Sequence, residues 1–170
     1  MRWKDVGENC CSVARTLAII GDPWTMLVLR DAFLGVRRFD DFHARLDVTR
    51  HLLADRLKKL VAEEVLQRVP YQERPRRYEY RLTEKGRDLF PVLMALMRWG
   101  DRWLAGSDGA PLTLVHRACG QVMTPLLVCS HCREPVTAHD TEPRPGPAMR
   151  ALPPTRRQGR QAQTVAQDEI

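Results

Sequence analysis

The sequence at residues 38–62, RFDDFHARLDVTRHLLADRLKKLVA, predicts the central motif of the fold. Its first part, residues 39–46, has apolar side chains at helical spacing and is typical of a short helix. The pair Asp47-Val48 then makes a turn, and Thr49 caps a longer helix that runs to about residue 62. Two helices joined by so short a turn form a helix-turn-helix. The residues of the first helix expected to face inward are Phe39, Phe42 and Leu46.

The longer helix has two different faces. Leucines spaced four and three apart, Leu53, Leu57 and Leu60, form a stripe that should be buried. A helix that buries leucines and presents basic residues at its start suits a groove of DNA, although an isolated helix of this kind fits a solvated amphipathic helix better. The flanking segments therefore decide between the two interpretations. The residues on the opposite face are Arg50, His51, Ala54, Asp55 and Lys58.

Two further helices are predicted before this motif. The first covers residues 12–20, and Gly21 should end it by adopting the left-handed conformation. The second covers residues 23–33, because Asp22 can cap free amides and Pro23 has no N–H to lose at the first helical position. Its residues expected to face the core are Trp24, Leu27, Val28 and Ala32.

A β-hairpin is predicted after the motif. Residues 66–71 and 77–82 are typical of strands, the second because charged and apolar side chains alternate along it. The connection at residues 72–76 is charged, and residues 68–87 hold 7 basic and 3 acidic side chains. Helix, turn, helix and hairpin in this order predict a winged helix, with the hairpin as a wing that can lie against phosphates.

A last helix is predicted from Thr83 to about residue 104. Pro91 lies inside it and should bend or split it, because proline removes one backbone hydrogen bond and crowds the preceding turn. The apolar surface of this helix is wider than packing on a small domain needs. We therefore expect it to contact a second copy of the chain, with part of it joining the core of its own chain. The apolar residues are Leu89, Val92, Leu93, Leu96, Trp99 and Trp103.

The composition favours a nucleic-acid partner. The 170 residues include 27 basic and 21 acidic side chains, a net charge of +6, and residues 1–105 carry 20 of the basic and 15 of the acidic ones. This excess in the part that holds the helix-turn-helix favours double-stranded DNA. No apolar run is long enough to span a membrane, and the start leads into no signal-peptide core. We expect a cytoplasmic, nucleoid-associated protein without membrane contact.

A series of short motifs stands in order along residues 10–104. They are Cys11-Ser12-Val13, Gly21-Asp22-Pro23-Trp24-Thr25, Leu29-Arg30, Arg38-Phe39-Asp40, Leu53-Ala54-Asp55-Arg56-Leu57, Tyr78-Glu79-Tyr80-Arg81-Leu82-Thr83-Glu84-Lys85-Gly86 and Arg98-Trp99-Gly100. In this order they resemble the HxlR-type winged helix-turn-helix transcriptional regulators. The resemblance implies a homodimer that binds an inverted-repeat operator, and no enzymatic activity. We expect a repressor, whose effector ligand is unknown.

The chain departs from the family after the recognition helix. The family usually has glycine there, whereas this chain reads Glu63-Glu64-Val65. If Glu64 adopts the left-handed conformation, it costs on the order of 1 kcal/mol relative to glycine.

The residues expected to contact DNA fall into two groups. Those facing the major groove are Thr49, Arg50, His51 and Lys58. Arg50 is the expected base reader, because its planar fork can match a guanine edge. The second group is expected to hold backbone phosphates, and for Arg56 in that group the alternative to phosphate contact is a salt bridge to an acid on a neighbouring helix. The residues expected to hold backbone phosphates are Arg38, Arg56, Lys59, Arg74, Arg76 and Arg77.

Two pairs of metal-binding residue types follow the last helix. An H-x2-C pair and a C-x2-C pair are separated by nine residues that read as a tight hairpin. Four N and S ligands suit one structural, tetrahedral Zn(II) per chain. His131 or His139 could take the place of the first histidine. The other interpretations are four uncoordinated side chains in a loose segment, or a reversible Cys129/Cys132 dithiol. The expected ligands are His116, Cys119, Cys129 and Cys132.

Cys11, at the start of the first helix, has two interpretations. The resemblance includes regulators that sense oxidants or electrophiles through a cysteine at this place, which makes Cys11 a candidate redox sensor. Free cysteines in general are small buried apolar residues, and this second interpretation is the one we favour.

These patterns predict a mainly α fold with a small β-hairpin. It is a winged helix-turn-helix with a three-helix core, a wing and a long C-terminal dimerisation helix, plus a short Cys/His-rich module. The expected domains are residues 1–105 for DNA binding and dimerisation, 106–140 for the zinc-knuckle-like module, and 141–170 for a disordered Pro/Gln/Arg-rich tail.

The expected function is sequence-specific DNA binding by a transcriptional regulator. One rival is a winged-helix module that docks proteins. The other is a thiol redox protein that uses the C-x2-C pair, although no βαβ pattern surrounds that pair.

Overall fold

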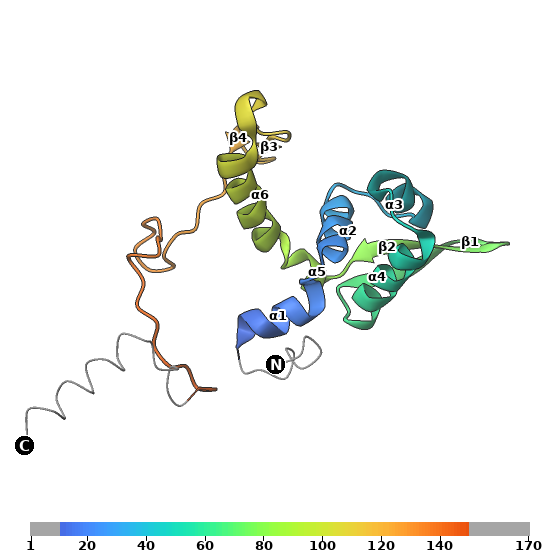
Figure 1. The fold of residues 1–170 in the computed structure, drawn as a ribbon, viewed down its shortest axis with the longest axis horizontal. Coiled ribbons are helices and arrows are strands. Elements are labelled where there is room, and N and C mark those ends of the chain that lie inside the picture. The colour runs from blue at the N-terminus through green and yellow to red at the C-terminus, as the bar shows by residue number, and fades with distance from the viewer. Residues whose placement is uncertain (1–10, 150–170) are drawn as a thin grey trace, which may run out of the picture. The chain divides into compact units, whose positions relative to one another are not determined.

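Over residues 12–104 the helices and strands follow the order expected from the sequence (Figure 1). The hairpin expected between Cys119 and Cys129 is wrong, because the paired strands lie at residues 114–115 and 122–123, on either side of His116 and Cys119. The structure, a computed structural model, describes residues 11–149 and divides the chain into two compact units between Leu126 and Leu127. This division falls later in the chain than the boundary expected at residue 105. The first unit contains α1 (Ser12–Ile20), α2 (Pro23–Phe33), α3 (Phe39–Leu46), α4 (Arg50–Ala62), β1 (Leu66–Glu73), β2 (Arg76–Leu82), α5 (Glu84–Arg87), α6 (Phe90–Leu104), β3 (Leu114–Val115) and β4 (Val122–Met123).

α1 ends where expected, but for a different reason. Gly21 has a φ of −72° and a ψ of 3°, so the left-handed conformation expected for it is wrong. The helix ends because Asp22 is extended, with a φ of −89° and a ψ of 133°, as residues before proline commonly are. Pro23 then begins α2. The Asp22 carboxylate accepts a hydrogen bond from the Thr25 N–H at 3.0 Å, which confirms the expected cap.

α3 and α4 form the expected helix-turn-helix. Asp47 between them is left-handed, with a φ of 49°, and the Thr49 hydroxyl accepts a hydrogen bond from the Leu52 N–H at 3.3 Å. The leucine stripe of α4 lies in the centre of the core, as expected. The buried apolar residues are Ile20, Val28, Leu29, Phe42, Leu46, Leu53, Leu57, Leu60, Val65 and Leu66.

α2 turns a slightly different face to the core than expected. Three of its four expected residues lie in the core or pack against it, whereas Trp24 is exposed. Thr25, Val28 and Leu29 are buried and spaced three and four apart, so they form one helical stripe. Trp24 lies one residue, or about 100°, to the side of that stripe.

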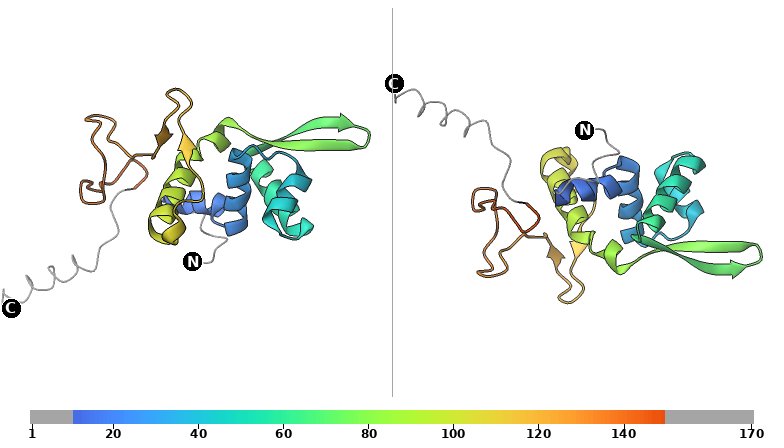
Figure 2. Two further views of the ribbon diagram at one scale, coloured as in Figure 1. Left: turned by 90° about the horizontal axis from the view of Figure 1, so that it is seen from above. Right: turned by 90° about the horizontal axis from the view of Figure 1, so that it is seen from below.

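β1 and β2 pair antiparallel and form a wing that extends away from the helices (Figure 2). Both strands are longer than expected, and only residues 74–75 remain in the turn. A register shift between Pro70 and Gln72 gives β1 a bulge. The base of the wing is tied to the start of α3, because the Tyr80 N–H donates to the Arg37 carbonyl at 2.7 Å.

The segments around the wing impose backbone requirements. Glu64 is left-handed, with a φ of 57°, which is the strained conformation considered for it from the sequence. Gly86 in α5 lies so close to the Val65 carbonyl oxygen that a Cβ atom would overlap it. Pro91 splits the expected last helix into α5 and α6, which confirms the effect expected of it.

α6 carries an apolar surface that its own chain leaves largely open. Leu93 packs against the core, as does Leu89 just before the helix. None of the described residues of α6 is buried, and Trp99 and Trp103 are 58% and 63% exposed. Only part of this surface therefore serves the core of its own chain.

Residues 127–149 are the described part of the second unit. Within them the only regular pairing is an isolated bridge between Val128 and Pro135. Most of the expected disordered tail, residues 141–170, lies outside the described residues. Along residues 11–149, no helix has the length and apolar character needed to cross a membrane.

Candidate nucleic-acid interface

The outer face of α4 carries the residues expected in the major groove. Thr49, Arg50, His51 and Lys58 are all exposed, while the leucine stripe of the same helix is buried. Because Thr49 is the N-cap, the free amides of the first turn lie at the same end of the helix. The structure thus presents a basic helix start to solvent, and base contact by these residues stays a prediction.

Two residues of α3 hold the Arg50 side chain. Its Nη2 donates to Asp40 Oδ1 at 2.8 Å, and its guanidinium carbon lies 4.9 Å from the centre of the Phe39 ring. Both contacts limit the directions in which the guanidinium can point. Asp40 and Phe39 were not predicted as site residues, since their contact with Arg50 depends on the angle between two helices.

Arg38 lies where α3 meets the base of the wing. Its guanidinium carbon is 4.6 Å from the centre of the Tyr71 ring, and its Nε lies 3.9 Å from a Glu79 carboxylate oxygen. Arg38 immediately precedes α3, the helix that also contacts Arg50. The starts of α3 and α4 and the base of the wing therefore meet in one basic region.

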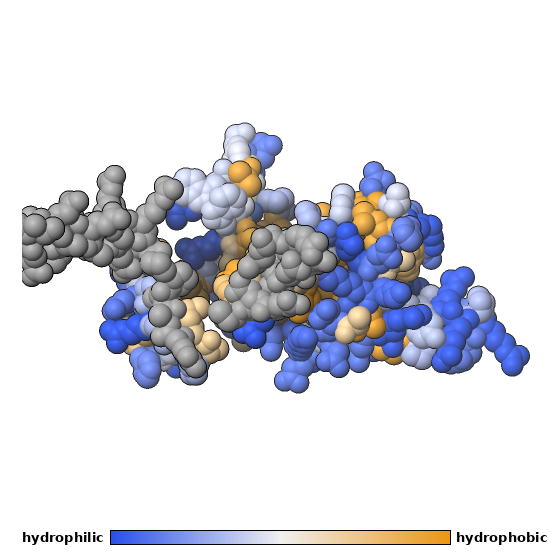
Figure 3. Space-filling view, turned by 60° about the horizontal axis from the view of Figure 1, so that its bottom comes forward, coloured by the Kyte–Doolittle hydropathy of each residue, from blue (hydrophilic) through white to orange (hydrophobic). Residues whose placement is uncertain are grey.

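The wing carries exposed arginines, some of them supported by an aromatic ring. Arg74, Arg76 and Arg77 are exposed, as a role in phosphate contact requires. The guanidinium carbon of Arg76 lies 5.5 Å from the centre of the Tyr78 ring, and that of Arg68 lies 3.9 Å from it. Arg68 was not among the predicted site residues, although its place in the first strand of the wing could have suggested it. On the face shown in Figure 3, most of the hairpin surface is hydrophilic.

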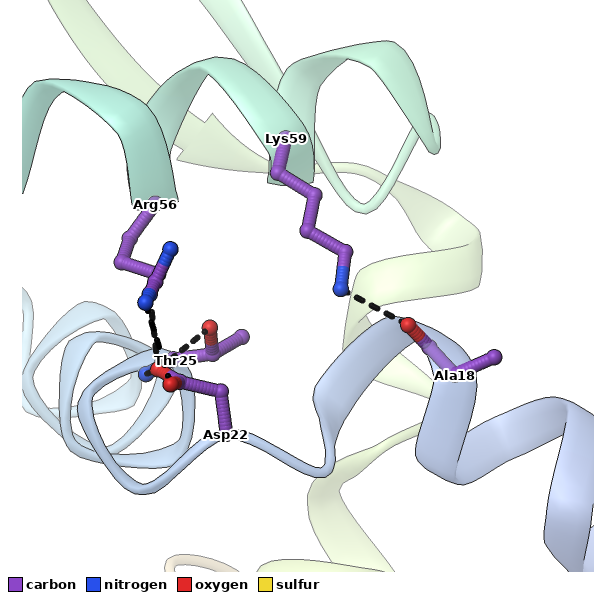
Figure 4. A network of polar contacts seen from close by, with 5 residues as sticks. All are labelled: Ala18, Asp22, Thr25, Arg56 and Lys59. Carbon is purple, nitrogen blue, oxygen red and sulfur yellow. Dashed lines mark hydrogen bonds and ion pairs between the residues drawn. The ribbon is translucent and has the colours of Figure 1, made fainter. Parts of the chain in front are cut away.

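Arg56 and Lys59 face the other way, toward α1 and α2 (Figure 4). Nε and Nη2 of Arg56 donate to the two carboxylate oxygens of Asp22 at 2.7 and 3.1 Å. Lys59 Nζ donates to the Ala18 carbonyl at 2.7 Å. The salt bridge considered for Arg56 is present. Contacts within the protein thus take the place of the phosphate contacts expected of these two residues.

Asp22 has two roles at this junction. It caps α2 and it also receives both hydrogen bonds from Arg56. Burial by itself would raise the pKa of Asp22, but the hydrogen bonds from Arg56 and Thr25 and the charge of Arg56 outweigh it. The pKa of Asp22 therefore lies below its ordinary value of 3.8. The cap was evident in the sequence, whereas the pairing with Arg56 was not.

The histidine and cysteine pairs lie in two turns. His116 and Cys119 are between β3 and β4 in the first unit, and Cys129 and Cys132 are in the second. Hydrogen bonds from the N–H groups of Cys132 and His131 lower the pKa of the Cys129 thiol. Among residues 11–149, no three His, Cys, Asp or Glu side chains form a group that could hold a metal ion. Zinc binding stays a prediction.

Cys11 is the N-cap of α1 and is exposed in the single chain. The favoured interpretation as a buried apolar residue is therefore wrong for the chain by itself. Redox sensing by Cys11 stays a prediction.

Sequence comparison places the chain among helix-turn-helix regulators. The HxlR-like helix-turn-helix family matches residues 19–108. An HTH-type transcriptional regulator of Mycobacterium tuberculosis is 47% identical over 140 residues, which cover 82% of this chain and 89% of that protein. The HTH-type transcriptional regulator YdeP of Bacillus subtilis is 35% identical over 55% of this chain and 73% of its own length.

Solved structures share the fold. PA1607, described as a candidate transcription factor, matches with a TM-score of 0.73 and 39% identity over 81% of this chain and 96% of its own. The redox regulator HypR in its oxidized form matches with a TM-score of 0.51 and 32% identity over 54% of this chain and 96% of its own. With its winged helix-turn-helix and these relatives, the chain belongs to the HxlR-like helix-turn-helix family and is a DNA-binding transcription regulator.

Proposed function

We propose that the protein is a homodimeric repressor that binds an inverted-repeat operator and reads a guanine in each half-site with Arg50. The observation that carries this proposal is the exposed start of α4, where Asp40 and Phe39 orient the Arg50 guanidinium. The Arg50 side chain is exposed, and once its Nη2 leaves Asp40 the guanidinium can donate to both acceptors on the major-groove edge of guanine. The exposed arginines of the wing supply phosphate contacts, which position the protein without reading sequence.

The exposed apolar residues of α1 and α6 support the dimer. Apolar surface gathered on two helices is typical of an interaction site, and each large side chain buried there contributes about 1.5–3 kcal/mol. A two-fold dimer would offer two copies of α4 to one face of the duplex, which corresponds to an inverted repeat. The residues are Val13, Leu17, Phe90, Val92, Leu96, Trp99, Trp103 and Leu104.

The dimer is tested by sedimentation and by mobility shift on DNA from upstream of the protein's own gene. Trp99→Glu should give monomers and weaken operator binding about 100-fold, because each half-site is then bound singly. Leu112→Glu is the matched control, since Leu112 is exposed but lies outside α1 and α6. A wild-type protein that is monomeric and binds no duplex at low salt would refute the proposal.

The sign of regulation is tested with a reporter gene placed behind the operator. Occupancy of promoter DNA by the dimer should exclude other proteins, so Arg50→Ala should raise expression. A fall in expression would show activation instead. The protein-docking alternative predicts no mobility shift of DNA from upstream of the protein's own gene, whereas phosphate contact predicts a shift that weakens steeply with salt.

A further inference from the structure

One face of the wing is apolar at its base and basic further out. Residues that pair directly across two strands point to the same face, as does every second residue along a strand. The pair at the base of this face belongs to the apolar core or packs against it, whereas Arg68 in the next pair is exposed. The pairs on this face are Leu66 with Leu82, Arg68 with Tyr80, and Pro70 with Tyr78.

The ring of Tyr78 on this face contacts two arginines. Arg68 reaches it diagonally from the neighbouring strand, and its guanidinium carbon lies 3.9 Å from the ring centre. Arg76 lies two residues before Tyr78 on β2, and its guanidinium carbon lies 5.5 Å from the same centre. Both distances are within about 6 Å, over which the face of an aromatic ring attracts a cation. Tyr78 thus gathers one guanidinium from each strand of the wing.

The aromatic ring leaves the charge of both arginines available. Arg81 on the same hairpin shows the opposite case, since its Nε and Nη2 donate to the Glu79 carboxylate at 3.1 and 3.0 Å. A carboxylate neutralises the cation and occupies its N–H donors, whereas the face of a neutral ring does neither. Within residues 11–149, neither Arg68 nor Arg76 forms an ion pair with an acidic side chain. The N–H donors of both arginines therefore remain open to a phosphate.

We propose that Tyr78 is a positioning residue that holds Arg68 and Arg76 ready for the phosphates of DNA, which makes Arg68 a further phosphate ligand. The inference rests on the phosphate contacts proposed above for the wing. An arginine that is already held by a ring loses less side-chain freedom when it binds, so the ring should raise the affinity for DNA. Because phosphate contacts do not read sequence, this gain should apply to operator and random DNA alike.

Removal of Arg68 tests the additional phosphate contact. Arg68→Ala should reduce the slope of log affinity against log salt by about 0.9, so that about 3.5-fold less affinity is lost between about 50 and 200 mM salt. Fluorescence anisotropy measures this slope with a duplex from upstream of the protein's own gene and with a random duplex. Arg117→Ala is the matched control, because Arg117 is exposed and lies outside the wing and the helix-turn-helix. A slope for Arg68→Ala equal to that of Arg117→Ala would overturn the role of Arg68.

Substitution of Tyr78 tests the positioning role. Tyr78→Leu removes the ring and keeps an apolar side chain. It should weaken binding to both duplexes about 5-fold, because two long side chains are then immobilised only when DNA binds. Tyr78→Phe keeps the ring face and should bind DNA as wild type does. Urea unfolding of both variants allows the affinities to be compared per folded molecule, and equal affinities of the two variants would overturn the role of the ring.

A mutant cycle shows whether Tyr78 acts through the two arginines. In a chain that carries Arg68→Ala and Arg76→Ala, the additional change Tyr78→Leu should cause no further loss of affinity. If Tyr78 only supported the structure of the wing, Tyr78→Leu would weaken binding equally with and without the arginines. That result would overturn the inference.

Arg77→Ala separates failure of this inference from failure of the proposed function, since Arg77 is an exposed residue of β2. If Arg76→Ala and Arg77→Ala reduce the salt slope while Arg68→Ala and Tyr78→Leu leave binding unchanged, the wing contacts DNA without help from the ring. Only this inference then fails. If none of the four variants changes the slope or the affinity, the phosphate contacts proposed for the wing fail as well.

Discussion

The two faces of α4 carry the same kinds of cation in opposite surroundings. Arg50 and its partner Asp40 are 63% and 72% exposed, whereas Arg56 and its partner Asp22 are 27% and 29% exposed. An exposed ion pair contributes about 0–1 kcal/mol, so Arg50 can exchange Asp40 for DNA at little cost. Hydrogen bonds to charged groups in a less exposed site contribute about 1.5–3 kcal/mol, so Arg56 serves the fold. The neighbouring helix, more than the residue type, decides which arginine is available to a ligand.

The largest expected effect is a loss of stability when a residue on the inner face of α4, which contacts α1 and α2, is replaced. Arg56→Ala should lower the free energy of unfolding by about 1.5–3 kcal/mol, because it removes both hydrogen bonds to Asp22. Urea unfolding measures this loss. DNA affinity per folded molecule should stay at the wild-type value. Unchanged stability with weaker binding to every sequence would return Arg56 to the group of phosphate ligands.

For the outer face of α4, we expect DNA binding to weaken and stability to stay nearly the same. Arg50→Ala should weaken operator binding by about 1–3 kcal/mol while binding to random DNA changes little, since a base contact is lost. Its stability should stay within about 0.5 kcal/mol of wild type. Competition mobility shifts with operator variants identify the base pair whose preference is relaxed.

Arg76→Ala in the wing is the matched control for Arg50→Ala. It should weaken binding to all sequences alike and reduce the slope of log affinity against log salt by about 0.9. Equal effects of the two variants on operator and random DNA would remove the distinction between base reading and phosphate contact.

Lys58 and Lys59 test the same difference between the outer and inner faces of α4, with smaller expected effects. Lys59→Ala should cost about 1 kcal/mol of unfolding free energy, because Lys59 Nζ bonds the Ala18 carbonyl at the end of α1. Lys58→Ala should leave stability unchanged and weaken DNA binding, with a salt slope lower by up to about 0.9, because it removes a positive charge from the face expected in the major groove. Paired urea and salt titrations check both. If the two variants prove interchangeable, the division of α4 into two faces is wrong.

The smallest expected effect is a dependence of stability on acid. The pKa of Asp22 is lowered in the folded protein because the bonds from Arg56 and Thr25 outweigh burial. The stability that Asp22 contributes is therefore fully present above pH 3.8, the ordinary pKa of its carboxyl group. It is lost as the pH falls through the lower pKa that Asp22 has in the folded protein. The stability difference between wild type and Asp22→Asn should be constant from neutral pH down to about pH 5 and shrink in stronger acid. A constant difference down to acid unfolding would contradict this role.

Features that depend on a few neighbouring residues were predictable from the sequence. The spacing of Leu53, Leu57 and Leu60 predicted the buried stripe, and the caps at Asp22 and Thr49 are present. The effect of Pro91 was also predicted, since proline acts on its own turn of helix.

Features that depend on how helices meet were not predictable. The exposure of Trp24 reflects the angle at which α2 packs, and a shift of one position around the helix removed it from the core. Arg56 and Lys59 face α1 and α2, yet their residue types are those of a phosphate-binding surface. Asp40 reaches Arg50 only because α3 and α4 cross at this end.

The sequence by itself determined the order of the elements, the helix-turn-helix and the family, because periodicity, caps and turns act over a few residues. Only the tertiary structure decided which cations of α4 remain open to DNA and which are bound to Asp22 and the Ala18 carbonyl. The reason is physical: a charge is available to a ligand only if no neighbouring segment satisfies it. That neighbour is set by packing, over 34 and 41 residues of sequence separation.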